Sequence, residues 1–215
     1  LRKEVLEKML PYLREHFGNP SSIYEFGQKS RRAIDSARKD IGDILGCSAK
    51  EVIFTGSGTE SANLAIRGAS AAYKNKGNHI ICTRVEHHAV LHTCQYLEKN
   101  GFDVTYLETD EYGLVDGEKL KKAIKPETIL VSIIYANNEI GTIQDISALS
   151  KIIKSKKTDQ YGPPFFHTDA CQAAGMLDIN VENLGVDQMT INGSKIYGPK
   201  GIGALYVKKG IKIIP

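Results

Sequence analysis

Short apolar runs alternate with amphipathic segments along almost the whole chain, and this alternation limits the possible folds more than any other feature of the sequence. The runs at 128–135 and 203–207 are apolar along most of their length, which is typical of parallel strands buried on both faces. The segment 28–45 instead repeats apolar residues at helical spacing and ends at Gly46, a common helix C-cap residue. The sequence therefore predicts a three-layer α/β fold, in which helices cover both faces of a mostly parallel sheet.

The expected elements can be placed along the chain. Strands are predicted at residues 51–55, 79–85, 102–107, 128–135, 165–168, 186–191 and 203–207. Helices are predicted at residues 2–15 with an interruption near Pro11, and at 28–45, 62–73, 86–100, 116–124 and 147–155. The polar, proline-bearing segment 154–164 is predicted to be a surface loop.

Composition and charge exclude several classes of protein. With 41% hydrophobic and 25% charged residues, the chain has the composition of an ordinary soluble globular protein. Its net charge is only +3 and its basic residues are dispersed, so we expect no nucleic-acid partner and no membrane association. We find no apolar run that could span a bilayer and no signal peptide. The four cysteines are scattered without a C-x-x-C pair, which argues against a zinc ribbon or a disulfide framework and fits the reducing cytoplasm.

Polar residues follow five of the predicted strands, at 57–59, 86–88, 137–139, 169–172 and 192–195. In open α/β sheets ligands bind beyond the carboxyl ends of the strands. We therefore expect these five loops to meet at one edge of the sheet and to form a single ligand site.

Lys195 lies in a Gly- and Pro-rich loop between two predicted strands. Burial of a lysine lowers its pKa, and such an amine can form a Schiff base with a carbonyl compound, including pyridoxal phosphate (PLP). A solvated loop lysine is the commoner case, and the loop alone leaves both possibilities open. Likewise, the Gly-rich turn at 56–59 precedes a helix and could bind an anion, or it could be a plain connection.

A PLP site needs groups that this set of loops contains. They are a lysine for the Schiff base, a carboxylate for the pyridine nitrogen, a flat group over the ring, donors to the phenolate oxygen and a helix N-terminus for the phosphate. In that order the candidates are Lys195, Asp169, His87, Asn138 with Gln172, and Gly58 with Thr59.

Six motifs in the chain, taken in order, resemble those of the NifS/IscS-type cysteine desulfurases of the class V aminotransferase family. They are residues 17–22 (Phe-Gly-Asn-Pro-Ser-Ser), 59–64 (Thr-Glu-Ser-Ala-Asn-Leu), 86–87 (Glu-His), 137–141 (Asn-Asn-Glu-Ile-Gly), 167–172 (His-Thr-Asp-Ala, then Gln172) and 195–201 (Lys-Ile-Tyr-Gly-Pro-Lys-Gly). The resemblance covers nearly all of residues 1–215. It implies the PLP-binding large domain of the aspartate aminotransferase-like fold.

The resemblance also implies an activity. Lys195 would carry PLP and move the α-proton of L-cysteine, and His87 would stack on the ring and assist proton transfer. A protein thiolate would take the sulfur as a persulfide, release L-alanine and pass the sulfur to an acceptor such as an iron–sulfur scaffold protein. The family further implies a homodimer. From the cysteines we expect the cytoplasm, and from the lack of a third ligand near His88 and His92 we expect no bound metal.

The chain departs from the family in three respects. The family's Ser-Gly-His-Lys is Asn-Gly-Ser-Lys at 192–195, so Asn192 and Ser194 would have to take over phosphate binding. The loop 154–164 is longer than usual. The family's opening segment, its sulfur-accepting cysteine, its substrate-binding arginine and its small domain have no counterpart here, and the chain opens with Leu1, so we expect an incomplete large domain that cannot complete sulfur transfer alone.

Three other functions remain possible on sequence grounds. Another class V enzyme, such as a selenocysteine lyase or an aminotransferase, would share Lys195 and Asp169. A truncated scaffold without cofactor would bind a sulfur-transfer partner only. A metal-binding module could use His87, His88 and His92, although no further ligand stands near them in the sequence. We interpret Cys171 as a small buried filler and His167 as a hydrogen-bonded core residue.

Overall fold

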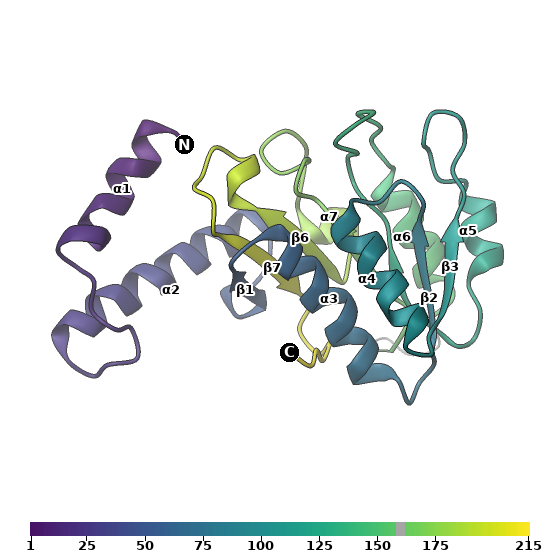
Figure 1. Cartoon of the computed structure of the whole chain (residues 1–215), viewed down its shortest axis with the longest axis horizontal. Coiled ribbons are helices and arrows are strands. Elements are labelled where there is room, and N and C mark those ends of the chain that lie inside the picture. Colours follow the sequence, from purple (N-terminus) through teal and green to yellow (C-terminus); the bar gives the residue numbers. More distant parts are fainter. Residues whose placement is uncertain (158–161) are drawn as a thin grey trace.

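Seven strands form one sheet in this computed structural model, which describes residues 1–157 and 162–215. The sheet has the order β1-β7-β6-β5-β4-β2-β3, and only β7 runs antiparallel to its neighbours. The predicted, mostly parallel sheet is therefore confirmed (Figure 1). The strands are β1 Val52–Thr55, β2 His79–Thr83, β3 Asp103–Leu107, β4 Thr128–Ser132, β5 Phe165–Asp169, β6 Gln188–Asn192 and β7 Gly203–Val207.

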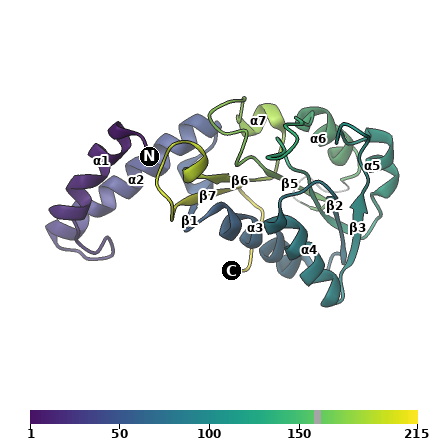
Figure 2. The same ribbon diagram turned by 45° about the horizontal axis from the view of Figure 1, so that its top comes forward.

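Helices cover both faces of the sheet, as Figure 2 shows, and they complete the three predicted layers. The α-helices are α1 Lys3–Arg14, α2 Glu25–Leu45, α3 Gly58–Tyr73, α4 His88–Lys99, α5 Gly117–Ala123, α6 Ile146–Lys154 and α7 Val181–Leu184. On one face, Ile66 of α3 and Leu97 of α4 share a buried cluster with Phe165 of β5. On the other face, α5, α6 and α7 bury apolar residues against the next residue of the same strand, Phe166. This alternation explains why two successive residues of β5 are both apolar, since the strand is covered on both faces.

The predicted interruption of the first helix near Pro11 is wrong. Helix α1 continues through Pro11 to Arg14, and the carbonyl of Pro11 accepts hydrogen bonds from the N–H groups of Glu15 and His16 at 2.9 and 2.8 Å. Proline removes one helical hydrogen bond, to the carbonyl of Glu7. Helix α1 has no buried residue, so water can solvate that carbonyl.

Most other element boundaries agree with the prediction to within a few residues. Helix α2 begins at Glu25, three residues before the predicted start, and ends at Gly46 in the left-handed conformation (φ 70°). The short helix α7 was not predicted, because four residues are too few to show a helical period. Within the predicted loop 154–164, residues 158–161 lie outside the described residues. Among the residues that the structure describes, no helix is long and apolar enough to cross a membrane.

Candidate active site

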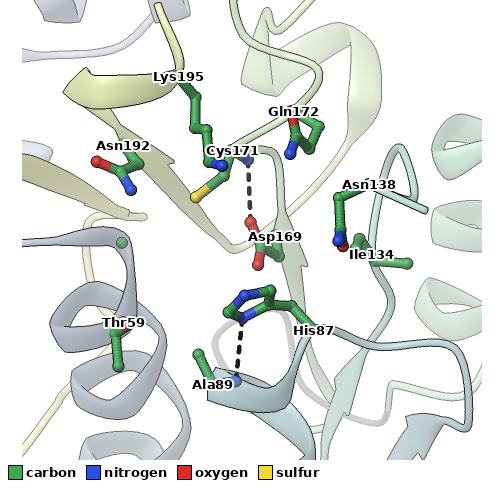
Figure 3. A pocket seen from close by; sticks show the side chains of 11 residues that line it. Thr59, His87, Ala89, Ile134, Asn138, Asp169, Cys171, Gln172, Asn192 and Lys195 are labelled. Carbon is green, nitrogen blue, oxygen red and sulfur yellow. Dashed lines mark hydrogen bonds between the residues drawn. The ribbon is translucent and has the colours of Figure 1, made fainter. Parts of the chain in front are cut away.

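The polar loops do meet at the carboxyl ends of the strands, where they enclose one cavity (Figure 3). All the predicted site residues except Ser194 line this cavity. They are Gly58, Thr59, His87, Asn138, Asp169, Gln172, Asn192 and Lys195, and Ala89, Ile134 and Cys171 complete the wall. The structure thus brings these residues together at one cavity, and their individual roles stay predictions.

The first turn of α3 contributes backbone amides to the cavity. Ser57 caps the helix, since its Oγ accepts a hydrogen bond from the N–H of Glu60 at 3.1 Å, and the Glu60 carboxylate accepts one from the N–H of Gly56 at 2.7 Å. The N–H groups of Gly58 and Thr59 belong to the first turn, where an α-helix supplies no carbonyl partner. The helix therefore presents free donors and the positive end of its dipole to the cavity.

Gly58 brings the backbone of α3 close to the opposite wall. A Cβ atom at this position would lie 2.8 Å from the Sγ of Cys171 and 3.1 Å from the Cβ of Asn192. Only a residue without a side chain leaves this part of the cavity open, so the close approach accounts for glycine at position 58.

Asp169 ends strand β5 and is almost entirely buried. Its Oδ1 accepts a hydrogen bond from the N–H of Cys171 at 2.9 Å, while its other oxygen lies on the side of His87 (Figure 3). His87 caps α4 through its Nδ1, which accepts the N–H of Ala89 at 3.1 Å. An accepting Nδ1 places the proton of a neutral imidazole on Nε2.

Lys195 ends a short 3₁₀ turn after β6, and its amine points into the cavity (Figure 3). The residue is exposed, which is the commoner of the two possibilities that the loop left open, and the turn stands at the rim of the cavity with solvent on its outer side. The Oδ1 of Asn192 accepts hydrogen bonds from both the N–H and the hydroxyl of Ser194, at 3.2 and 3.3 Å. This contact turns the Ser194 hydroxyl toward Asn192, and it leaves the amide Nδ2 of Asn192 free to donate.

The chain is similar to known proteins along its whole length. A family model described as "Aminotransferase class-V" matches residues 1–213. The chain belongs to the class V aminotransferase family.

Relatives of this class V aminotransferase chain include proteins named cysteine desulfurase IscS. The one from Dictyoglomus turgidum is 55% identical over 215 residues, which are 100% of this chain and 53% of that protein. The one from Methanosarcina thermophila is 53% identical and is matched over 52% of its length. This chain thus spans about half the length of these curated relatives.

Solved structures agree with the family. A structure named "NIFS-LIKE PROTEIN" superposes with a TM-score of 0.95 at 37% identity, over 100% of this chain and 58% of that one. A second, named "SspA in complex with cysteine", gives a TM-score of 0.93 at 40% identity, over 100% of this chain and 61% of that one. The predicted resemblance to the NifS/IscS-type proteins is confirmed.

The residues of this class V aminotransferase site fit PLP. An amine, a carboxylate and free helix N–H groups, from Lys195, Asp169 and the first turn of α3, line one cavity. These are the groups that the aldehyde, the pyridine nitrogen and the phosphate of PLP require. The space that a Cβ of residue 58 would fill lies directly at the helix end, where a phosphate would approach the backbone.

Sequence reasoning did not predict the burial of Glu86 beside this class V site. Glu86, which precedes His87, is only 6% exposed, and its Oε1 accepts a hydrogen bond from the N–H of Ile134, a long-range contact that no local pattern reveals. Cys171, expected to be a buried filler, is half-buried in the cavity wall. Burial and the nearby Asp169 raise the pKa of its thiol. His167 is a fully buried core residue, as predicted, with Ser132 Oγ and Thr190 Oγ1 at 2.8 and 3.0 Å from its ring nitrogens.

The histidines of the metal-binding alternative lie at the start of α4 in this class V fold. The rings of His88 and His92 stack with their centroids 5.0 Å apart. Within residues 1–157 and 162–215, no group of three or more His, Cys, Asp or Glu side chains is arranged to hold a metal ion.

Proposed function

We propose that the protein to which this chain belongs is a PLP-dependent cysteine desulfurase, which converts L-cysteine to L-alanine and transfers the sulfur as a persulfide. One observation carries the proposal: the Lys195 amine, the Asp169 carboxylate and the first turn of α3 face the same cavity. The names of the relatives, cysteine desulfurase IscS at 55% and 53% identity, favour this reaction over that of a selenocysteine lyase or another aminotransferase.

Each wall of the cavity would bind one part of PLP. The N–H groups of Gly58 and Thr59, with the amide of Asn192, would hold the phosphate, so a free hydroxyl would not be required from Ser194. Asp169 would accept a hydrogen bond from the pyridine N–H. Asn138 and Gln172 would donate to the phenolate oxygen. When bound, PLP supplies an electron sink that stabilises negative charge at the substrate α-carbon.

Lys195 and His87 are the residues to which we assign proton transfer in this reaction. Lys195 would hold PLP through its amine, which is also placed to take up the α-proton of the substrate. The imidazole of His87 would cover the ring. Its neutral form carries the proton on Nε2, because Nδ1 accepts the N–H of Ala89, so Nε2–H can hydrogen-bond a group that takes part in proton transfer while the capping contact is kept.

The sulfur moves to a thiolate. A protein thiolate attacks the sulfur of L-cysteine, so that an S–S bond forms, the C–S bond breaks and the bonding electrons pass to the carbon that becomes the alanine methyl group. Cys171 is unsuited to this role, because burial and Asp169 raise the pKa of its thiol and disfavour the thiolate. We expect the nucleophilic cysteine and the substrate-binding arginine to lie in the part of the protein that this chain does not span.

The proposal extends to the partners and the assembly. We expect an iron–sulfur scaffold protein, or another thio-cofactor pathway, to receive the persulfide sulfur. A cytoplasmic homodimer is the expected assembly. The alternative of a scaffold without cofactor predicts that the cavity binds no PLP.

Borohydride trapping tests the cofactor site directly. PLP is added to the purified chain, the visible absorption is recorded, and reduction with borohydride is followed by peptide mass analysis. We expect the adduct on Lys195, its loss in Lys195→Ala, and its retention in Lys200→Ala, which removes an exposed lysine of the same loop. An adduct on other lysines only, in this chain and in a longer form of the protein alike, would refute the proposal.

A further inference from the structure

Glu86 is a buried carboxyl group just outside the cavity wall. It lies between the end of β2 and His87, and it is 6% exposed. Its Oε1 accepts two hydrogen bonds of 2.7 Å, from the Oγ1 of Thr83 and from the backbone N–H of Ile134. Within the described residues its Oε2 has no hydrogen-bond partner. Burying a carboxyl group with an unpartnered oxygen costs free energy, so its presence here calls for a structural or functional explanation.

Burial keeps this carboxyl protonated at neutral pH. Burial raises the pKa of Glu86 to about 8, an effect that the hydrogen bonds from Thr83 and Ile134 oppose and that the negative charge of Asp169 reinforces. Glu86 can therefore accept its two hydrogen bonds without adding a second negative charge beside Asp169.

The hydrogen bond to Ile134 joins two loops of the active site. Glu86 stands in the connection between β2 and α4, whereas Ile134 stands just after β4. A second hydrogen bond joins the same two segments in the opposite sense, from the Nδ2 of Asn137 to the carbonyl of Val85 at 2.8 Å. We call this pair of hydrogen bonds the 86/137 clasp.

The clasp lies beside two predicted cofactor ligands. His87 directly follows Glu86, and Asn138 directly follows Asn137. Both ligands line the cavity, but neither Gln172 nor Lys195 belongs to the clasped segments. Backbone hydrogen bonds from the N–H groups of Ile133 and Tyr135 to β5, at 3.1 and 2.9 Å, already fix the segment after β4. The clasp therefore joins the loop that contains His87 to this fixed segment.

We propose that Glu86 is a positioning residue, which holds the His87 loop against the segment after β4 and thereby sets the place of His87 relative to Asn138. The inference rests on the proposed PLP site, since it assigns Glu86 a purpose within that site.

Three variants and one control test this role. Glu86→Gln keeps an uncharged acceptor of the same size, Glu86→Ala removes it, and Asn137→Ala removes the second hydrogen bond of the clasp. The matched control is Glu98→Ala, which removes an exposed glutamate of the neighbouring α4 whose carboxylate accepts a hydrogen bond from the Tyr106 hydroxyl at 2.9 Å.

The first readout is made without PLP. Hydrogen exchange of the Ile134 amide and the NMR signal of the His87 imidazole, assigned with His87→Gln, are compared among the variants. We expect Glu86→Ala to speed exchange at Ile134 about tenfold and to shift the His87 signal, and Asn137→Ala to shift that signal too. In Glu86→Gln and Glu98→Ala we expect the exchange rate of the Ile134 amide and the His87 signal to stay close to those of wild type.

The second readout is the affinity for PLP, measured by absorbance well below the melting temperature of every variant. We expect Glu86→Ala to bind PLP about tenfold more weakly, with affinity restored in Glu86→Gln. A Glu86→Ala protein that melts earlier yet keeps its PLP affinity and its His87 signal would refute the positioning role. If neither this chain nor a longer form of the protein binds PLP, the proposed cofactor site fails, and the Ile134 and His87 readouts alone then decide whether the clasp exists.

Discussion

Replacing Glu86 with glutamine should change how the stability of the protein depends on pH. The folded pKa of Glu86 is about 8, against an ordinary value of 4.5. Between these two pH values the unfolded carboxyl has lost its proton while the folded one keeps it. Stability from this group is therefore complete below pH 4.5 and is lost as the pH rises to 8, by about 1.4 kcal/mol for each pH unit.

The whole interval corresponds to about 5 kcal/mol, which is a large part of the stability of a single domain. Glutamine at position 86 does not titrate and keeps the acceptor for Ile134. We therefore expect the free energy of unfolding of Glu86→Gln, relative to wild type, to rise by about 4 kcal/mol between pH 5 and pH 8.

Urea unfolding of both proteins at pH 5, 6.5 and 8 measures this difference. Other titrating groups, such as His167, affect both proteins alike and cancel in the comparison. Glu98→Gln serves as the control, because it makes the same substitution at an exposed glutamate. A difference between Glu86→Gln and wild type that stays constant with pH, or that falls, would show that Glu86 is ionised in the folded protein and would refute the reasoning.

Three further predictions concern the cavity and the core. Gly58→Ala should weaken PLP binding about tenfold in an absorbance titration, because the new Cβ lies 2.8 Å from the Sγ of Cys171, and adding Cys171→Ala should restore part of the affinity. Burial lowers the pKa of His167 from 6.5 to about 4, so acidification through this range should cost about 3 kcal/mol in denaturant unfolding, and His167→Gln should remove that loss. The amine of Lys157 lies 2.8 Å from the buried carboxylate of Asp187, and Lys157→Met leaves that carboxylate without its cation. We expect this variant to lose about 3–5 kcal/mol of stability in the same assay. A loss below about 1 kcal/mol, the value of a surface ion pair, would contradict this expectation.

The sequence was sufficient to predict the layers of the fold but not the order of the strands. Strand β4, for example, has the apolar run Ile-Leu-Val at its centre because both of its faces are covered, and this pattern is local. The pairing of β1 with β7, the first and last strands in the sequence, and the antiparallel direction of β7 depend on long-range contacts that leave no local signal.

The site was predictable to a similar degree. The loops after the strands had to meet, because parallel strands place their carboxyl ends on one edge, and the family resemblance supplied the roles of residues such as Asp169 and His87. Three details escaped prediction. The hydroxyl of Ser194 turns to Asn192, Lys195 stands at the exposed rim, and buried Glu86 accepts a hydrogen bond from the segment after β4, almost fifty positions away in the sequence. Each of these depends on side-chain contacts and not on the sequence pattern.

The 86/137 clasp bears on how the protein can evolve. Each of its two hydrogen bonds joins one side chain, of Glu86 or Asn137, to a backbone group, of Ile134 or Val85. Every amino acid except proline offers the N–H group needed at position 134, and every amino acid offers the carbonyl needed at position 85. The clasp itself therefore constrains only the backbone at positions 85 and 134, whereas drift at 86 and 137 is restricted to side chains that can accept and donate, respectively. Homologous sequences should keep an acceptor at position 86 and a donor at position 137.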